Sequence, residues 1–212
     1  MTHAVQSDLK RLDQLPQMGG LDHSPRGRVL RAAAYLFRKK GYAATPVREL
    51  AQLVGIQSGS LFHHFKTKDD ILLAVMQEAI AYNTLRMQQA VDVEGLAQKI
   101  KALVRAELEA INGNTGDAMA VLVFEWDALK PQHQAPLLAM RDEYETIWLE
   151  VLAQARVAGV IQHPPFIWRR LIGGAIAWTV TWYRPDGKMT LDQLAEIVMQ
   201  MGQGHSVDAV SH

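Results

Sequence analysis

The segment from residue 41 to residue 68, GYAATPVRELAQLVGIQSGSLFHHFKTK, restricts the fold more than any other part of the chain. It predicts two short helices joined by a turn that contains a glycine. In the first helix, apolar side chains recur at i, i+3, i+4 and i+7 and form one stripe, made of Val47, Leu50, Ala51 and Val54. We expect the Thr45 hydroxyl to cap this helix, Pro46 to take its first position, and Gly55 to end it in a left-handed conformation.

The second helix of the segment, predicted from Gln57 to about Phe65, is too short to be a core element of its own. Leu61 and Phe65 anchor it inward, whereas its other side chains are mostly polar and uncharged. Such groups can face base edges or phosphates. Two short helices in this arrangement can present one of them to the major groove, so the segment predicts DNA binding.

Several short motifs in this region carry a family resemblance. Gly-Tyr-x-x-Thr at Gly41, Val-Arg-Glu-Leu-Ala at Val47, and Gly-Ser-Leu-Phe-His-His-Phe at Gly59, followed by Lys68, resemble the DNA-binding domain of TetR/AcrR-type transcriptional regulators. The resemblance covers roughly residues 26 to 75. It implies an all-helical homodimer that binds a near-palindromic operator and releases it when a small molecule enters the C-terminal domain.

The resemblance also suggests which residues contact DNA. Two positions depart from the family pattern, because Phe62 stands where the family usually has Tyr, and Gln57 stands where a small hydroxyl residue is common. We expect phosphate or base contacts from Arg48, Lys68, Thr45 and His63, and an apolar contact from Phe62. The full set of candidate DNA-binding residues is Thr45, Arg48, Gln57, Ser58, Gly59, Ser60, Phe62, His63, His64 and Lys68.

The charge distribution fits this assignment. The formal net charge is zero, but residues 1 to 75 hold 11 Lys and Arg against 6 Asp and Glu, while residues 76 to 212 hold 11 against 16. Basic charge near a helix-turn-helix steers it to DNA phosphates.

No apolar run approaches the roughly 20 residues that span a bilayer, and the N-terminus lacks the apolar centre of a signal peptide. We expect a cytoplasmic protein without membrane contact.

Helical periodicity and its breaks predict an all-α fold. Further helices are expected at 25–40, from 67 or 68 to about 89, and at 93–112, 117–129, 136–158, 165–183 and 190–202. The expected architecture is an N-terminal three-helix helix-turn-helix DNA-binding domain followed by a C-terminal helical bundle for ligand binding and dimerisation. The corresponding ranges are a partly disordered extension at 1–24, a DNA-binding domain at 25–70, and a ligand-binding and dimerisation domain at 71–212.

All five tryptophans lie after residue 125, which suggests a small-molecule pocket in the bundle. Each of them can instead fill the core or the seam of a dimer. The candidate ligand-binding residues are Met87, Met119, Trp126, Trp148, Trp178 and Trp182.

Residues 171–183 and the last helix form a candidate two-fold four-helix interface, although a monomeric core can show the same pattern. Residues 177–197 also resemble the C-terminal region of TetR-type regulators of fatty-acid and steroid-acid breakdown, which respond to acyl-CoA thioesters. The second resemblance implies an acyl-CoA or another apolar effector.

Catalytic and metal-binding patterns are not evident in the sequence. His63 and His64 are adjacent and point about 100° apart on a helix, which disfavours a shared metal ion. Glu107 with Glu109, and Glu143 with Glu145, have i, i+2 spacing, so we expect them on solvated faces. The chain has no cysteine. We therefore expect no enzyme activity, cofactor or metal.

Two functional hypotheses remain. The first is a ligand-responsive repressor, and the second is a DNA-bound structural or interaction factor without a small-molecule inducer. A cavity of several hundred Å³ between helices would favour the first.

Overall fold

The computed structural model describes residues 21–113 and 115–202, and helices form all the regular elements of that part. Most of the predicted N-terminal extension, residues 1–20, lies outside the described residues. The α-helices are α2 (Pro25–Lys40), α3 (Val47–Val54), α4 (Ser58–Leu61), α5 (Lys68–Ala90), α6 (Leu96–Asn112), α7 (Gly116–Phe124), α8 (Pro131–Val157), α9 (Pro165–Trp178) and α10 (Leu191–Gly202). Two 3-10 helices, η1 (Trp126–Ala128) and η2 (Thr179–Thr181), follow α7 and α9. The all-α prediction is confirmed.

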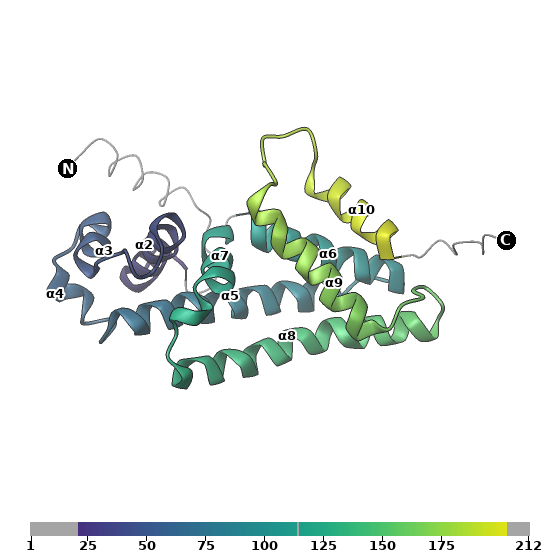
Figure 1. Cartoon of the computed structure of the whole chain (residues 1–212), viewed down its shortest axis with the longest axis horizontal. Coiled ribbons are helices and arrows are strands. Elements are labelled where there is room, and N and C mark those ends of the chain that lie inside the picture. Colours follow the sequence, from purple (N-terminus) through teal and green to yellow (C-terminus); the bar gives the residue numbers. More distant parts are fainter. Residues whose placement is uncertain (1–20, 114, 203–212) are drawn as a thin grey trace, which may run out of the picture.

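The elements divide between the two ends of an elongated molecule (Figure 1). Helices α2, α3 and α4 gather at one end, and α6, α8, α9 and α10 lie toward the other. The long helix α5 runs from the first group into the second, and α7 stands beside α2. A continuous apolar core extends through both groups. The helix predicted from residue 67 or 68 to about 89 is therefore present as α5 and links the two ends, and α7 provides a second contact between them.

Helix α2 has the start and the end that the sequence predicts. The Ser24 hydroxyl accepts a hydrogen bond from the Gly27 N–H at 3.0 Å, and Pro25 occupies the first turn. Its inward face is buried and comprises Val29, Leu30, Ala33, Leu36 and Phe37. Three cationic side chains, residues 38–40, lie in the last turn at the negative end of the helix dipole.

The start of α3 differs from the prediction. Pro46 has an extended conformation (φ −77°, ψ 147°) and is the residue before the helix, and no side chain caps α3. The Thr45 hydroxyl is buried and donates instead to the Gly41 carbonyl oxygen at 2.8 Å. It thereby satisfies an acceptor just beyond the end of α2. The predicted end is confirmed, because Gly55 is left-handed with φ 77°.

Helix α4 is shorter than predicted and spans only Ser58–Leu61. After it, the N–H groups of residues 62–64 donate to carbonyl oxygens three residues back, so the chain continues in tight turns to Phe65. Leu61 and Phe65 are both buried, as expected, and fix this stretch to the core. The side chains between them are left at the surface.

Helix α5 begins with a capping box. The Thr67 hydroxyl accepts from the Asp70 N–H at 3.1 Å, and the Asp70 carboxylate accepts from the Thr67 N–H at 2.9 Å.

Among the described residues, no helix has both the length and the hydropathy required to cross a membrane.

Three boundaries in the C-terminal bundle correct the predictions. Helix α8 begins at Pro131, five residues earlier than expected, and contains Pro136. Proline fits the first helical turn, where its missing N–H has no partner to lose, so Pro131 opens the helix rather than preceding it. The helix expected over 165–183 ends at Trp178 and continues as η2. Similarly, the helix expected over 117–129 ends at Phe124, before η1.

Candidate functional site

The predicted DNA-contact surface, defined as Arg48 together with residues 57–64, is mostly exposed. Arg48, Gln57, His63 and His64 are solvent-exposed, and Phe62 is 50% exposed although it is aromatic. Among the described residues, no side-chain hydrogen bond or ion pair is formed by Arg48, Gln57 or His63. The surface therefore presents side chains that the fold itself does not use.

Two further predicted DNA-binding residues have partners within the protein. Thr45 is fully buried, with its hydroxyl bonded to main-chain oxygens as described above. The Lys68 ammonium lies 4.2 Å from the centroid of the Tyr42 ring and donates to the Ala43 carbonyl oxygen at 3.4 Å. Burial lowers the pKa of Lys68, although the carboxylate of Asp69 opposes that shift. Lys68 thus stabilises the loop before α3.

Helix α7 joins the DNA-contact end to the bundle through polar contacts. The Arg38 guanidinium, at the end of α2, donates to the Gly116 carbonyl oxygen at 3.3 Å and lies 3.5 Å from the Asp117 carboxylate. Just after α7, the Glu125 carboxylate accepts from the Tyr42 N–H at 3.1 Å. A displacement of α7 would therefore be felt at the end of α2 and in the loop that follows it.

A third connection involves the start of α5. The Asp69 carboxylate accepts from the Tyr42 hydroxyl and pairs with the Lys130 ammonium, which lies just before α8. Hydrogen bonds from Lys130 and Tyr42 hold the pKa of Asp69 below its ordinary value. Asp69 thus ties the loop after α2 to the segment between η1 and α8.

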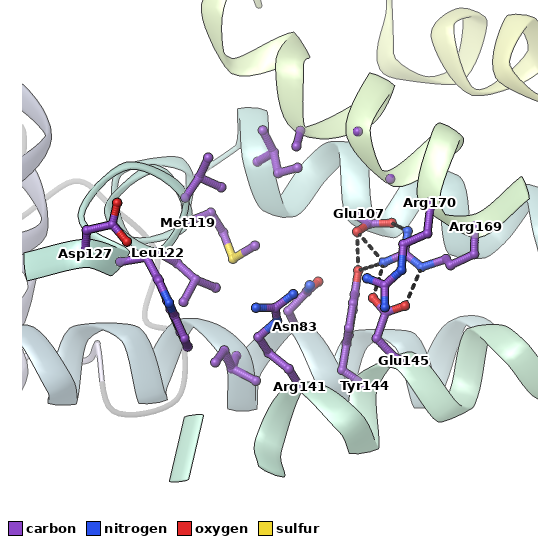
Figure 2. Close-up of a pocket in the computed structure, with 17 residues that line it drawn as sticks. Asn83, Glu107, Met119, Leu122, Asp127, Arg141, Tyr144, Glu145, Arg169 and Arg170 are labelled. Carbon is purple, nitrogen blue, oxygen red and sulfur yellow. Dashed lines mark hydrogen bonds and ion pairs between the residues drawn. The ribbon is translucent and has the colours of Figure 1, made fainter. Parts of the chain in front are cut away.

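A cavity of about 560 Å³ lies in the C-terminal bundle. Figure 2 shows the side chains that enter it from several helices. Its apolar lining consists of Ile80, Ile111, Met119, Leu122, Val123, Trp126 and Ala177, with Gly173 and Gly174. Its polar lining consists of Asn83, Glu107, Asp127, Arg141, Tyr144, Glu145, Arg169 and Arg170. In the described part of the chain, no group of His, Cys, Asp and Glu is placed to hold a metal ion.

One end of the cavity is formed by a cluster that we call the Arg169 cluster, comprising Glu107, Tyr144, Glu145 and Arg169 (Figure 2). Arg169 Nη1 and Nη2 donate to the two oxygens of Glu107, each at 3.1 Å. Its Nε and Nη2 donate to Glu145 at 3.2 and 2.8 Å, and Nη2 lies 3.1 Å from the Tyr144 hydroxyl. The Tyr144 hydroxyl also donates to Glu107. Every guanidinium nitrogen of Arg169 therefore has a carboxylate partner.

Burial strengthens the charge interactions within the Arg169 cluster. The Arg169 guanidinium lies 4.6 Å from the centroid of a ring in Trp148, which is fully buried. Burial disfavours the Arg169 charge, but attraction from Glu107, Tyr144 and Glu145 outweighs this and raises the pKa of Arg169. Burial, followed by the charge of Glu107, raises the pKa of Tyr144 well above its ordinary value. Arg169 thus remains charged and Tyr144 neutral.

This cluster corrects a sequence prediction. Glu107 and Glu145 were expected on solvated faces, but Glu107 is buried, and both bind Arg169. Arg169 was not predicted at all. The partners lie 62 and 24 residues apart in the chain, so no local spacing brings them together. The available signal was the adjacent pair Arg169 and Arg170 within the largely apolar segment PFIWRRLIGGAIAW.

The six predicted ligand-binding residues occupy three kinds of position. Met119 and Trp126 line the cavity. Met87 and Trp148 are fully buried and are not part of its lining. Trp178 and Trp182 are 63% and 50% exposed and lie outside the lining.

An exposed apolar face runs along α9. Ile167, Leu171, Gly174 and Trp178 follow one another at helical spacing and are all exposed, and a Cβ atom at Gly174 would meet nothing within 4 Å. On α10, Ile197 and Met201 are also exposed. Both helices belong to the region predicted as a dimer interface.

Comparison with known proteins identifies the family. Residues 29–75 match the model of the bacterial regulatory proteins of the tetR family, and residues 94–203 match the tetracyclin repressor-like C-terminal domain. The chain belongs to the TetR family. Its DNA-contact end is therefore a helix-turn-helix domain, and the protein is a TetR-family transcriptional regulator.

Individual relatives extend the comparison. The transcriptional repressor KstR2 of Rhodococcus jostii is 30% identical over 178 residues, which is 81% of this chain and 85% of that protein. The crystal structure of PfiT, described as a superantigen, is 51% identical with a TM-score of 0.73, covering 85% of this chain and 96% of PfiT. AibR, crystallised with isovaleryl coenzyme A and operator DNA, has a TM-score of 0.75 at 22% identity, covering 82% and 96% of the two chains.

Proposed function

We propose that this TetR-family regulator is a repressor that binds a near-palindromic operator as a homodimer and is released by a small apolar or acyl-CoA-like effector. The observation that carries the proposal is the cavity of about 560 Å³ lined by α7, which also contacts the DNA-binding domain. This volume lies within the usual range for small-molecule sites. The division at residue 70 into DNA-binding and ligand-binding domains, and a cytoplasmic location, belong to the same proposal.

The proposed mechanism couples the cavity to DNA through α7. Met119, Leu122 and Val123 line the cavity from α7, whereas Arg38 holds the start of that helix from the side of the DNA-binding domain. An effector that pushes α7 outward would move the Arg38 and Glu125 contacts together. The two DNA-contact surfaces of a dimer would then lose the spacing of one DNA turn, about 34–36 Å, that neighbouring half-sites require.

Homodimerisation is supported by the exposed apolar face of α9 and α10. Exposed apolar faces on two helices that both pack against α6 suit an isologous four-helix interface. Replacing Leu171, which is 70% exposed, with Glu should shift the sedimentation of the protein from dimer to monomer. The matched change Val157→Glu, at a 91% exposed position outside these helices, should leave the dimer intact. An unchanged dimer in Leu171→Glu would exclude this face as the interface.

The effector class in this proposal rests on the cavity and on two relatives. KstR2 is a repressor, and AibR was crystallised with an acyl-CoA thioester and operator DNA. The likeness to AibR supports only the statement that this fold can hold both ligands. Regulation by an effector, rather than catalysis, is the role that family membership supports.

The proposal is tested by titrating the purified protein with duplex DNA from upstream of its own gene. At physiological salt we expect binding at least about 1,000-fold tighter than to a scrambled duplex of the same length. Equal affinity for the two duplexes would contradict the proposal.

A second candidate function is a DNA-bound structural or interaction factor without a small-molecule inducer. The observation that favours it is the 51% identity to PfiT, a protein described as a superantigen. Equal affinity for upstream and scrambled DNA would leave this candidate as the stronger one.

A further inference from the structure

Some polar side chains of the cavity have hydrogen-bond or ion-pair partners within the protein, and others do not. The Arg169 cluster is internally complete, because each guanidinium nitrogen has a carboxylate partner. It contains two carboxylates and one guanidinium, so its negative charge disfavours a further anion. An anionic ligand is therefore not held at this end of the cavity.

Arg141 is the contrasting cation. Its guanidinium enters the cavity from α8 and lies 5.6 Å from the centroid of the Trp126 ring. Among the described residues, no hydrogen bond or ion pair to Arg141 is found. A guanidinium has five N–H donors in a planar fork that matches a carboxylate or a phosphate. Arg141 thus offers a charge and donors that the fold does not use.

Asn83 supplies a second unused polar group. It lies on α5, lines the same cavity and is 4% exposed, and its Oδ1 atom is buried without a hydrogen-bond partner in the described structure. Figure 2 places Asn83 and Arg141 between Met119 and the Arg169 cluster. A buried acceptor without a donor costs about 1–3 kcal/mol. A ligand hydroxyl or amide N–H would remove that cost.

We propose that the effector is an amphipathic anion with three features. A carboxylate or phosphate binds Arg141 beside Trp126, a hydroxyl or N–H group donates to Asn83 Oδ1, and an apolar body packs against Ile80, Met119 and Leu122. The inference rests on the proposed function in one respect, because it takes the cavity as the effector site. It makes the ligand more specific than an apolar molecule, since both polar groups must be matched at once.

The test uses isothermal titration of the full-length, DNA-free protein with four probes that each carry a ten-carbon chain: 3-hydroxydecanoate, decanoate, decan-1-ol and 3-hydroxydecanoyl-CoA. We expect decanoate to bind at least about tenfold tighter than decan-1-ol, because a charge-assisted pair contributes roughly 1.5–3 kcal/mol. The 3-hydroxy acid should bind several-fold tighter still. Equal affinity of acid and alcohol, together with no binding of 3-hydroxydecanoyl-CoA below 1 mM, would overturn the proposal.

Arg141→Gln tests the charge and Arg170→Gln is its matched control. Arg170 also lines the cavity but is exposed, with its guanidinium 5.0 Å from the centroid of the Phe166 ring. Arg141→Gln should remove the preference for decanoate over decan-1-ol, whereas Arg170→Gln should keep it. Loss of the preference in both variants, or in neither, would overturn the assignment to Arg141.

The thioester distinguishes the two sources of negative charge. In 3-hydroxydecanoyl-CoA a thioester replaces the carboxylate, so the phosphates of coenzyme A carry the negative charge. If Arg141→Gln weakens the thioester at least about tenfold, a phosphate is the group that binds Arg141. If it weakens only the free acids, the group is a carboxylate.

Asn83→Leu tests the acceptor by two independent measurements. The variant should bind 3-hydroxydecanoate and decanoate equally. Without ligand, its Tm should rise by about 2–4 °C, because the substitution removes an unsatisfied buried group. A surviving preference for the hydroxy acid, or a fall in Tm, would overturn the role of Asn83. Since these titrations contain no DNA, their failure is separate from a failure of operator binding.

Discussion

The DNA-contact surface and the Arg169 cluster use polar side chains in opposite ways. Arg48, Gln57 and His63 are exposed and have no side-chain hydrogen bond or ion pair within the described protein. Glu107 and Arg169 are buried and hold each other through two hydrogen bonds. The first region keeps its hydrogen-bonding capacity for a partner, whereas the second uses its capacity to hold α6, α8 and α9 together. Substitutions should therefore cost binding in one region and stability in the other.

The largest expected effect is that of Arg169→Leu. It leaves Glu107 and Glu145 as buried carboxylates without their cation, which should lower the free energy of unfolding by about 3–5 kcal/mol. Urea denaturation followed by circular dichroism measures the change. The neighbouring exposed Arg170→Leu should change stability by less than about 0.5 kcal/mol. A loss below about 1 kcal/mol in Arg169→Leu would show that the cluster does not stabilise the bundle.

The opposite behaviour is expected of Arg48→Ala. Loss of a charged contact to phosphate should weaken binding by about 1.5–3 kcal/mol for every duplex and reduce the slope of log affinity against log salt by about 1. Fluorescence anisotropy at several salt concentrations measures both quantities. Stability should change by less than about 0.5 kcal/mol. Unchanged DNA affinity in a destabilised variant would contradict the comparison.

Substitution of Lys68 should affect both stability and DNA binding, unlike substitutions in either of the two regions. Its ammonium packs on the Tyr42 ring, so Lys68→Ala should reduce stability by about 0.5–1 kcal/mol. If the same group also contacts phosphate, the variant loses DNA affinity independently of sequence and has a shallower salt slope. Melting curves and anisotropy on the same preparation separate the two effects. Selective loss at a single base pair would contradict the phosphate role.

The smallest effect is expected at the contact between the two ends. Because the pKa of Asp69 is lowered in the folded state, this carboxylate adds stability above its ordinary value of 3.8, and that stability is lost as the pH falls through the folded-state value. Asp69→Asn should therefore cost about 0.2–1 kcal/mol at pH 7 and nothing in strong acid. Denaturation at several pH values measures this. The exposed control Asp142→Asn should change the stability at pH 7 by less than about 0.5 kcal/mol.

The two regions also differ in what their sequences predict. Gly55, Leu61 and Phe65 act through neighbours a few residues away, so the helix-turn-helix could be derived from local spacing. Thr45 was assigned to the wrong partner, because its hydroxyl turns back to the end of α2 instead of forward to α3. A short hydroxyl side chain can bond either to a carbonyl oxygen before it or to an N–H group after it in the chain. The sequence does not show which of the two it chooses.

The cavity shows where local spacing stops being informative. The sequence predicts a tryptophan-rich pocket, and Trp126 does line the cavity, but Trp148 is fully buried outside the lining and Trp178 is exposed. Which face of a helix points inward depends on the helices that pack around it. Arg169 and Glu107 meet only after α6 and α9 are packed together, so their pairing is a tertiary property.

The central claim is that filling the cavity controls DNA binding, and the absence of cysteine from the chain allows a direct measurement. Leu122→Cys places one thiol in the cavity lining, and an alkyl methanethiosulfonate then attaches an apolar chain that dithiothreitol removes. We predict that modification weakens operator binding by about 5–150-fold and that reduction restores it. The same treatment of Val157→Cys, at a 91% exposed position, should have no effect. Complete modification of the Leu122→Cys thiol with unchanged operator affinity would contradict the account.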